Sequence, residues 1–340
     1  MRIASLTSRA GRINRNMSRR SFLIFGAVSL AAPVVATAQQ TGKVYRIGFL
    51  GGASPSGYAV LVNALRLGLG DHGYVEGRNI TIEYRWAEGK YERLPALAAE
   101  LVRLQPDIII TQGTPAALAA KETTATIPIV MAIVGDPVEA GVVASLARPG
   151  GNVTGLSFLM GDLNAKRLEL LKTLIPDLQR AGVLMNPDNA VMATVVRAMV
   201  DRAQALNVKL QTVNVRALSE LDTAFALAKA RTEALVVPDE GLFIANGRRI
   251  ADLAMRGRLP SIGFREYCES GGLLAYGVDF PHIWRQSADL VDRVLKGTKP
   301  ADLPIQQATR FELVINVKTA KALGVSIPTS IQLRANDVIE

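Results

Sequence analysis

Residues 107–123, DIIITQGTPAALAAKET, contain the pattern that decides the fold. The apolar, β-branched run from Asp107 to Thr111 predicts a buried strand. The turn Gln112-Gly113-Thr114-Pro115 leads from this strand directly into a helix, because proline suits a first helical turn. A strand followed at once by a helix is the repeating unit of a parallel sheet that helices cover on both faces.

The same unit recurs along the chain in two series of similar length. The first predicts strands at 44–50, 80–84, 107–111, 129–134 and 153–158, with helices at 59–72, 94–104, 115–123 and 137–147. The second predicts strands at 181–185, 210–215, 234–238, 261–264 and 273–276, with helices at 162–174, 190–206, 220–230 and 243–256. A helix at 281–295 and a strand with a short helix over 311–327 follow. The fold class is therefore α/β, with two doubly wound parallel-sheet lobes.

Short turn-rich segments separate the two series. Pro149-Gly150-Gly151-Asn152 and the stretch 155–161 predict extended joints that cross between the lobes and act as a hinge. We assign residues 42–158 to the first lobe, with 280–305 returning to it, and residues 159–279 to the second lobe. The C-terminal tail, 306–340, is expected to pack across the hinge region.

The first 38 residues have the pattern of an export signal. Six arginines and no acidic residue precede or flank an apolar run from Phe22 to Val35, and Ala36-Thr37-Ala38 forms a small-residue cleavage site. The stretch Ser18-Arg19-Arg20-Ser21-Phe22-Leu23 resembles a twin-arginine signal. Cleavage near Ala38/Gln39 predicts a periplasmic protein, whereas an uncleaved membrane anchor is the alternative. Removing the six arginines lowers the formal net charge from +9 to +3, which excludes a nucleic-acid interpretation of the high pI.

The sequence lacks the motifs of several classes of enzymes and metal-binding proteins. It contains no P-loop, no dinucleotide-binding glycine motif, no nucleophile elbow and no HEXXH zinc motif. The two histidines, His72 and His282, lie far apart in the sequence and suit surface or helix-end positions, and Cys268 is the single cysteine. We therefore predict no metal, no cofactor and no catalytic residue.

The candidate ligand residues follow the predicted strands, because ligands of open α/β sheets bind beyond the carboxyl ends of the strands. Each has a plainer alternative: Thr114 and Asp136 cap helices, and the turn at Asn186 only reverses the chain. Four aromatic side chains near strand ends suit an apolar or aromatic solute, although each also suits core packing. The candidate set is Gly52, Ala53, Ser54, Gln112, Gly113, Thr114, Ala116, Gly135, Asp136, Phe158, Asn186, Asp239, Phe243, Phe264 and Tyr276.

Several motifs in fixed order resemble the ABC transporter substrate-binding family that includes the tryptophan and tyrosine receptors. The resemblance covers essentially the whole chain after Gln39. It rests on Arg46-Ile47-Gly48-Phe49-Leu50, Gly73-Tyr74, Glu76-Gly77, Asn79-Ile80, Glu83-Tyr84-Arg85, Pro106-Asp107, Pro128-Ile129-Val130, Gly135-Asp136-Pro137, the run from Leu146 to Gly155, and Phe311 to Asn316 with Lys318-Thr319-Ala320.

The resemblance implies a type I periplasmic binding protein, in which two lobes close over a ligand across a hinge. For an amino-acid ligand, it assigns the carboxylate to first-lobe groups at Ser54, Thr114 and Ala116, and the amine to Asp239. The implied function is the solute receptor of an ABC importer, which captures a small organic solute, such as an aromatic or branched amino acid, and delivers it to the permease subunits. The implied receptor is monomeric, and it meets the membrane only through the transporter.

Two other classes of function remain open at this level. A periplasmic ligand sensor would use the same fold to feed a signalling partner. An enzyme on an α/β scaffold would need a nucleophile and a base held together, and the sequence offers no such pair. A DNA-binding repressor is disfavoured by the export signal and by the lack of a helix-turn-helix before Val44.

Overall fold

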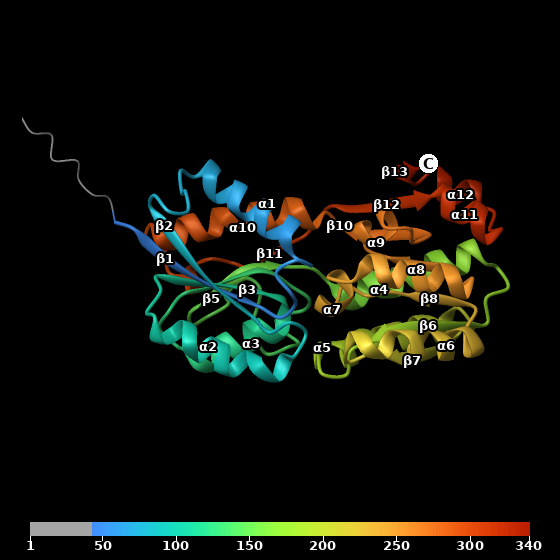
Figure 1. Ribbon diagram of the computed structural model, residues 1–340, viewed down its shortest axis with the longest axis horizontal. Coiled ribbons are helices and arrows are strands. Elements are labelled where there is room, and N and C mark those ends of the chain that lie inside the picture. Colours follow the sequence, from blue (N-terminus) through green and yellow to red (C-terminus); the bar gives the residue numbers. More distant parts are fainter. Residues whose placement is uncertain (1–42) are drawn as a thin grey trace, which may run out of the picture. The chain divides into compact units, whose positions relative to one another are not determined.

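The computed structural model describes residues 43–340, and the predicted export signal at 1–38 lies outside these residues. Two sheets organise the described chain (Figure 1). The first has the strand order β11-β5-β4-β3-β1-β2 and the second the order β13-β12-β10-β9-β8-β6-β7. Both are parallel except where β10 meets β12. The predicted α/β class with two doubly wound lobes is confirmed.

The first lobe contains the elements before residue 158 and those from 280 to 307. Its strands are β1 (Tyr45–Gly51), β2 (Ile80–Trp86), β3 (Ile108–Gln112), β4 (Ile129–Val134), β5 (Val153–Ser157) and β11 (Gln306–Gln307). Its helices are α1 (Ala59–Asp71), the 3-10 turn η1 (Tyr91–Arg93), α2 (Leu94–Arg103), α3 (Gly113–Thr123), α10 (Phe280–Leu295) and the 3-10 turn η3 (Pro300–Asp302).

The second lobe contains the remaining elements. Its strands are β6 (Arg180–Met185), β7 (Lys209–Asn214), β8 (Ala234–Val236), β9 (Ser261–Gly263), β10 (Leu274–Val278), β12 (Phe311–Asn316) and β13 (Asp337–Ile339). Its helices are α4 (Met160–Leu174), α5 (Val191–Ala205), the 3-10 turn η2 (Leu218–Glu220), α6 (Leu221–Arg231), α7 (Gly241–Ile244), α8 (Gly247–Gly257), α9 (Arg265–Glu269), α11 (Val317–Leu323) and α12 (Thr329–Gln332).

The apolar character of β3 follows from helices on both faces of its sheet. Ile108 and Ile110 pack into the core that α1 and α10 cover, whereas Ile109 packs into the core under α2 and α3. All three are fully buried. Figure 1 shows α1 and α10 on one side of this sheet and α2 and α3 on the other. Because successive side chains of a strand point to opposite faces, a strand buried on both faces is apolar throughout.

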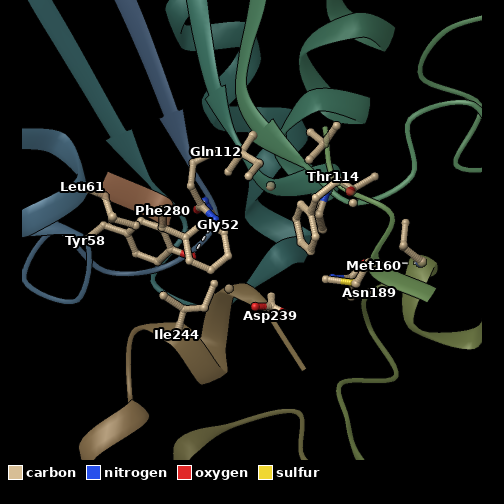
Figure 2. Close-up of a pocket in the computed structure, with 18 of the residues that line it drawn as sticks. Gly52, Tyr58, Leu61, Gln112, Thr114, Met160, Asn189, Asp239, Ile244 and Phe280 are labelled. Carbon is tan, nitrogen blue, oxygen red and sulfur yellow. Dashed lines mark hydrogen bonds between the residues drawn. The ribbon is translucent and has the colours of Figure 1, made fainter. Parts of the chain in front are cut away.

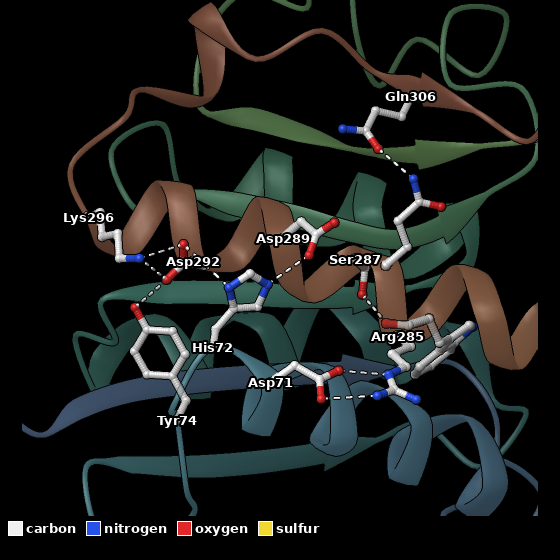
Figure 3. Close-up of polar contacts among 11 residues, drawn as sticks. Asp71, His72, Tyr74, Arg285, Ser287, Asp289, Asp292, Lys296 and Gln306 are labelled. Atoms are coloured by element: carbon white, nitrogen blue, oxygen red, sulfur yellow. Dashed lines mark hydrogen bonds and ion pairs between the residues drawn. The ribbon is translucent and has the colours of Figure 1, made fainter.

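Helix α10 is fastened to the end of α1 by polar contacts (Figure 3). His72 lies 2.7 Å from a carboxylate oxygen of Asp289, and Tyr74 donates a hydrogen bond of 3.0 Å to Asp292. Arg285 bonds both carboxylate oxygens of Asp71. Although α10 follows the second lobe in sequence, these contacts and the buried face of the helix fix it on the first lobe.

The prediction of a helix over 137–147 is wrong. Pro137 begins a single turn, in which Ala140 donates to the Asp136 carbonyl and Val142 to the Pro137 carbonyl. Gly141 then adopts a left-handed conformation with φ +73°, which ends the turn. The helix predicted over 243–256 is two helices, α7 and α8, with Asn246 at the break.

The segments that cross between the lobes also differ from the prediction. Pro149 to Asn152 is the turn from β4 to β5 and stays within the first sheet. The chain crosses at three places: after Ser157, at Asp279 and between Gln307 and Phe311. Only residues 308–310 of the C-terminal tail therefore cross, because β12 and β13 extend the second sheet, where β12 pairs antiparallel to β10.

Candidate functional site

A narrow cleft lies between the lobes, at the carboxyl ends of the strands. Its lining comes from both sheets, as Figure 2 shows for Gly52, Gln112 and Thr114 on one side and Asp239 and Ile244 on the other. Seven of the residues predicted from the sequence line it: Gly52, Gln112, Gly113, Thr114, Gly135, Phe158 and Asp239. The strand-end rule thus located residues on both walls.

Eight of the predicted residues do not line this cleft. Phe243 and Phe264 are fully buried in the second lobe, and Tyr276 stacks on Phe311. Asn186 is buried and donates to Glu240, while Asp136 caps its own turn by accepting from the Glu139 N–H. Ala53 and Ala116 are buried, and the Ser54 hydroxyl accepts a hydrogen bond from the Gly57 N–H.

Most of the cleft wall was missed by the sequence analysis. Most of these residues reach the cleft from helices and turns, which the strand-end rule does not cover, whereas Ile133 and Val134 end strand β4 and were overlooked. They are Tyr58, Leu61, Tyr91, Pro115, Ile133, Val134, Met160, Asn189, Val191, Gly241, Ile244, Phe280 and Trp284.

Aromatic side chains form much of the first-lobe wall. The ring of Tyr58 lies 5.8 Å from that of Trp284 and 6.4 Å from that of Trp86, between centroids. Phe49 and Tyr84 complete this cluster behind them. Tilted contacts of this kind are favourable between aromatic rings, and they support an apolar surface at the cleft.

The helix α3 begins inside the cleft at Gly113, where the positive φ of +76° suits glycine. Its amino-terminal residue Gln112 provides no side-chain cap, and Thr114 lies within the first turn instead of capping it. A regular helix leaves the N–H groups of Gly113 and Thr114 without intrahelical partners, while that of Ala116 pairs with the carbonyl four residues earlier. Gly113 and Thr114 therefore line the cleft at the positive end of a helix dipole.

Gln112 joins the polar groups of the first-lobe wall. Its side-chain oxygen accepts from the Gly52 N–H at 3.0 Å, and its side-chain nitrogen donates to the Tyr58 hydroxyl at 3.0 Å. Burial raises the pKa of Tyr58 well above its ordinary value, and the second-lobe carboxylates of Glu240, Glu266 and Asp239 raise it further. Tyr58 is therefore a neutral hydroxyl that faces an acidic wall.

Asp239 belongs to the second-lobe wall and forms a buried ion pair with Arg167. Arg167 donates to both of its carboxylate oxygens, at 2.6 and 2.9 Å, and also to the carbonyls of Val237 and Tyr276. The pair compensates each charge and fixes the orientation of the carboxylate. Each oxygen keeps a further lone pair for a donor in the cleft.

Two more carboxylates lie near this wall without a cationic partner among the described residues. Glu240 is buried, which raises its pKa, and four neutral donors surround it. Both oxygens of Glu266 are shielded and have no hydrogen-bond partner within the described protein, and burial raises the pKa of this group to about 7. Among residues 43–340, no lysine or arginine lines the cleft, so the site is suited to a solute with a positively charged group.

Metal and membrane features are absent from residues 43–340. These residues contain no group of three or more His, Cys, Asp or Glu side chains that could bind a metal ion. Across the same range, every helix is too short or too polar to span a bilayer.

The sequence of the chain matches one protein family over residues 54–339, the ABC transporter substrate binding proteins. The chain belongs to this family. Among its relatives, the tyrosine-binding protein of Clostridioides difficile strain R20291 is 34% identical over 257 residues, which are 75% of this chain and 74% of that protein.

Solved structures place this substrate-binding protein among two-lobed relatives. A Streptococcus pneumonia ABC domain in complex with L-Trp superposes with a TM-score of 0.79 and 27% identity, over 86% of this chain and all of that one. A conserved domain protein of Vibrio cholerae superposes with a TM-score of 0.82 and 29% identity, over 87% of this chain and all of that one. The type I periplasmic binding protein fold is therefore shown, as the sequence resemblance implied.

Proposed function

We propose that this substrate-binding protein is the periplasmic solute receptor of an ABC importer and that its solute is an amino acid with an aromatic or large apolar side chain. The observation that carries the proposal is the composition of the cleft. Apolar side chains such as Leu61, Trp284 and Ile244 form most of the wall, while Asp239 and the start of α3 supply polar groups. Such a wall fits a large apolar group joined to a small zwitterion.

Each part of the amino acid has a matching group in the cleft. The N–H groups of Gly113 and Thr114 bind the carboxylate at the helix start. Asp239, oriented by its ion pair with Arg167, accepts hydrogen bonds from the ammonium group. The relatives that bind tyrosine and tryptophan support an aromatic side chain in the apolar part.

The cellular role extends the same proposal. An export signal cleaved near Ala38/Gln39 delivers the folded receptor to the periplasm, where it works as a monomer and presents its closed form to the permease subunits. It releases the solute chemically unchanged. Replacing both Arg19 and Arg20 by lysine should leave the protein in the cytoplasm, and cell fractionation measures this directly.

Calorimetry on the chain from Gln39 onward tests the solute. L-tryptophan, L-tyrosine, L-phenylalanine and L-leucine are compared with indole-3-propionate, which lacks the amine, tryptamine, which lacks the carboxylate, and benzoate. We expect an intact amino acid to bind and each truncated probe to bind at least about 100-fold more weakly, because a desolvated partner group is left unpaired. Preferential binding of benzoate or indole-3-propionate, or chemical conversion of the bound compound, would contradict the proposal.

Asp239→Asn tests the ammonium contact with a near-isosteric side chain. Asp289→Asn on α10 is the matched control, since Asp289 pairs with His72 at the surface of the first lobe. We expect only the former to weaken amino-acid binding, and to do so without affecting the amine-free probes.

A further inference from the structure

One hydrogen bond joins the two lobes directly at the wall of the cleft. The hydroxyl of Tyr91, in the first-lobe turn η1, donates to a carboxylate oxygen of Glu240, which begins α7 in the second lobe. Both side chains are buried. Burial and the negative charge of Glu240 raise the pKa of Tyr91 well above its ordinary value, so this hydroxyl keeps its proton and donates.

The second lobe holds the Glu240 carboxylate in position for this contact. One oxygen accepts from the Leu242 N–H at 2.8 Å, and the other faces the side-chain amides of Asn186 at 3.3 Å and Asn189 at 3.5 Å. No lysine or arginine forms an ion pair with it in residues 43–340. The carboxylate therefore depends on neutral donors, and Tyr91 is the donor that the first lobe supplies.

Gly241 provides the space for the first lobe to approach. A β-carbon at this position would lie 3.0 Å from the Tyr91 hydroxyl and 3.4 Å from the side-chain nitrogen of Gln112. Gln112 in turn bonds Tyr58, so three polar side chains of the first lobe surround one glycine of the second. The contact surface around Glu240 is thus closely fitted on both sides.

We propose that Tyr91 and Glu240 form a latch that holds the closed lobes together and sets how long a solute stays bound. They act as positioning residues for closure and not as determinants of solute choice, because the Tyr91 hydroxyl is occupied by Glu240 and not by the solute. When the lobes open, the Tyr91 hydroxyl and the Glu240 carboxylate form hydrogen bonds with water instead. The latch therefore stabilises only the closed state. The inference rests on the proposed function, in which closure retains the solute.

The test compares Tyr91→Phe with Tyr74→Phe. Each variant loses one buried phenolic hydroxyl that donates to a carboxylate, but the bond from Tyr74 to Asp292 lies within the first lobe (Figure 3). The probes are L-tryptophan and L-tyrosine, with stopped-flow displacement for rates and calorimetry for affinity. We expect Tyr91→Phe to release the amino acid about 10- to 100-fold faster, because a factor of this size corresponds to the loss of a hydrogen bond to a charged group. The order of affinities among the amino acids should stay the same. Tyr74→Phe should release it at the wild-type rate.

Two further measurements keep the outcome decisive. The double variant that combines Glu240→Gln with Tyr91→Phe should release the amino acid no faster than the single variants, because both changes act on the same interaction. Equal release rates for Tyr91→Phe and Tyr74→Phe overturn the latch while leaving the receptor function intact.

An experiment without ligand distinguishes a failure of the proposed solute class from a failure of the latch. If wild type binds none of the amino acids, the proposed solute class is wrong, and small-angle X-ray scattering of the ligand-free proteins then decides on the latch. A wild type more compact than Tyr91→Phe supports it, and identical scattering overturns it.

Discussion

Arg167 on α4 donates to both carboxylate oxygens of Asp239, and neither side chain is exposed. The two residues come from different parts of the second lobe and meet behind the cleft, whose lining includes Asp239 but not Arg167. A buried ion pair of this kind contributes less to net stability than to placement, because removing both charges from water offsets much of their attraction. We therefore interpret Arg167 as the residue that fixes the orientation of the Asp239 carboxylate.

Arg167→Met should destabilise the protein strongly, because it leaves the carboxylate of Asp239 buried without a partner. We expect a loss of about 3–5 kcal/mol in the free energy of unfolding, measured by urea denaturation. Arg285→Met is the control, since its pair with Asp71 is half exposed, and it should change stability little. Adding Asp239→Leu to Arg167→Met should recover part of the loss, and a further loss in the double variant would argue against this account.

Gly57→Ala should impair closure without harming the lobes. A β-carbon on Gly57, in the first lobe, would lie 2.4 Å from the Ala245 β-carbon and 2.8 Å from its α-carbon, in the second lobe. Overpacking of this kind costs about 1–3 kcal/mol, which corresponds to a loss of affinity of about 5- to 150-fold in calorimetry. Gly70→Ala, with open space around the new methyl group, is the control and should bind as wild type does. Ligand-free thermal midpoints should be lowered by neither change.

Glu266 should make stability depend on pH between about 4.5 and 7. Its pKa is raised to about 7 in the folded protein, because burial disfavours the charged carboxylate. A raised carboxyl pKa means that the folded state binds the proton more tightly, so stability is greatest below the unfolded value and falls as pH rises through 7. Glu266→Gln should remove this dependence and be more stable than wild type at pH 8, by up to about 3 kcal/mol, but not at pH 4.5.

Thermal unfolding at several pH values measures this difference. Glu269→Gln, on the exposed side of the same helix, is the matched control. A Glu266→Gln variant that is less stable than wild type at every pH would contradict the interpretation.

Cys268 should react with a maleimide only when the second lobe unfolds locally. The thiol is buried, its pKa is raised to about 12 by burial, and the sulfur lies 3.8 Å from the Val314 carbonyl oxygen. Because the thiolate is the reactive species, a maleimide should label the native protein at the rate of local unfolding and the urea-unfolded protein at once. Leu333→Cys in a Cys268→Ser background should label immediately, because Leu333 is 83% exposed. Fast labelling of Cys268 in the native protein would show that the second lobe unfolds locally with high frequency.

The part of the site that depends on sheet topology could be predicted from the sequence. Gln112 ends a strand, and Gly113 and Thr114 begin the helix that follows it, so their place at the cleft could be deduced from one stretch of chain. Tyr58 and Trp284 could not be deduced in this way. Tyr58 precedes α1 and Trp284 lies within α10, and the positions of these helices depend on packing between distant segments.

Arg167 carried a signal that could have been used. The buried positions of α4 include Leu163, Leu170 and Leu174, and residue 167 falls on the same face at helical spacing. A charged residue in the middle of an apolar stripe requires a buried partner of opposite charge, and Asp239 was the candidate acid at a nearby strand end. The tail beyond Phe311 gave no such signal, because the sequence pattern of a strand does not show which of two sheets it joins.

The three crossings of the chain determine when each lobe can be completed during synthesis. The first lobe needs α10 and β11, which lie after the whole of the second lobe's first segment, and the second lobe needs β12 and β13 at the end of the chain. A ribosome therefore releases nearly the entire polypeptide before either core can close, so that both lobes form at almost the same moment. For the same reason, neither lobe can be obtained as one uninterrupted fragment, and a functional split of this protein would have to cut the chain inside a loop and reunite both pieces.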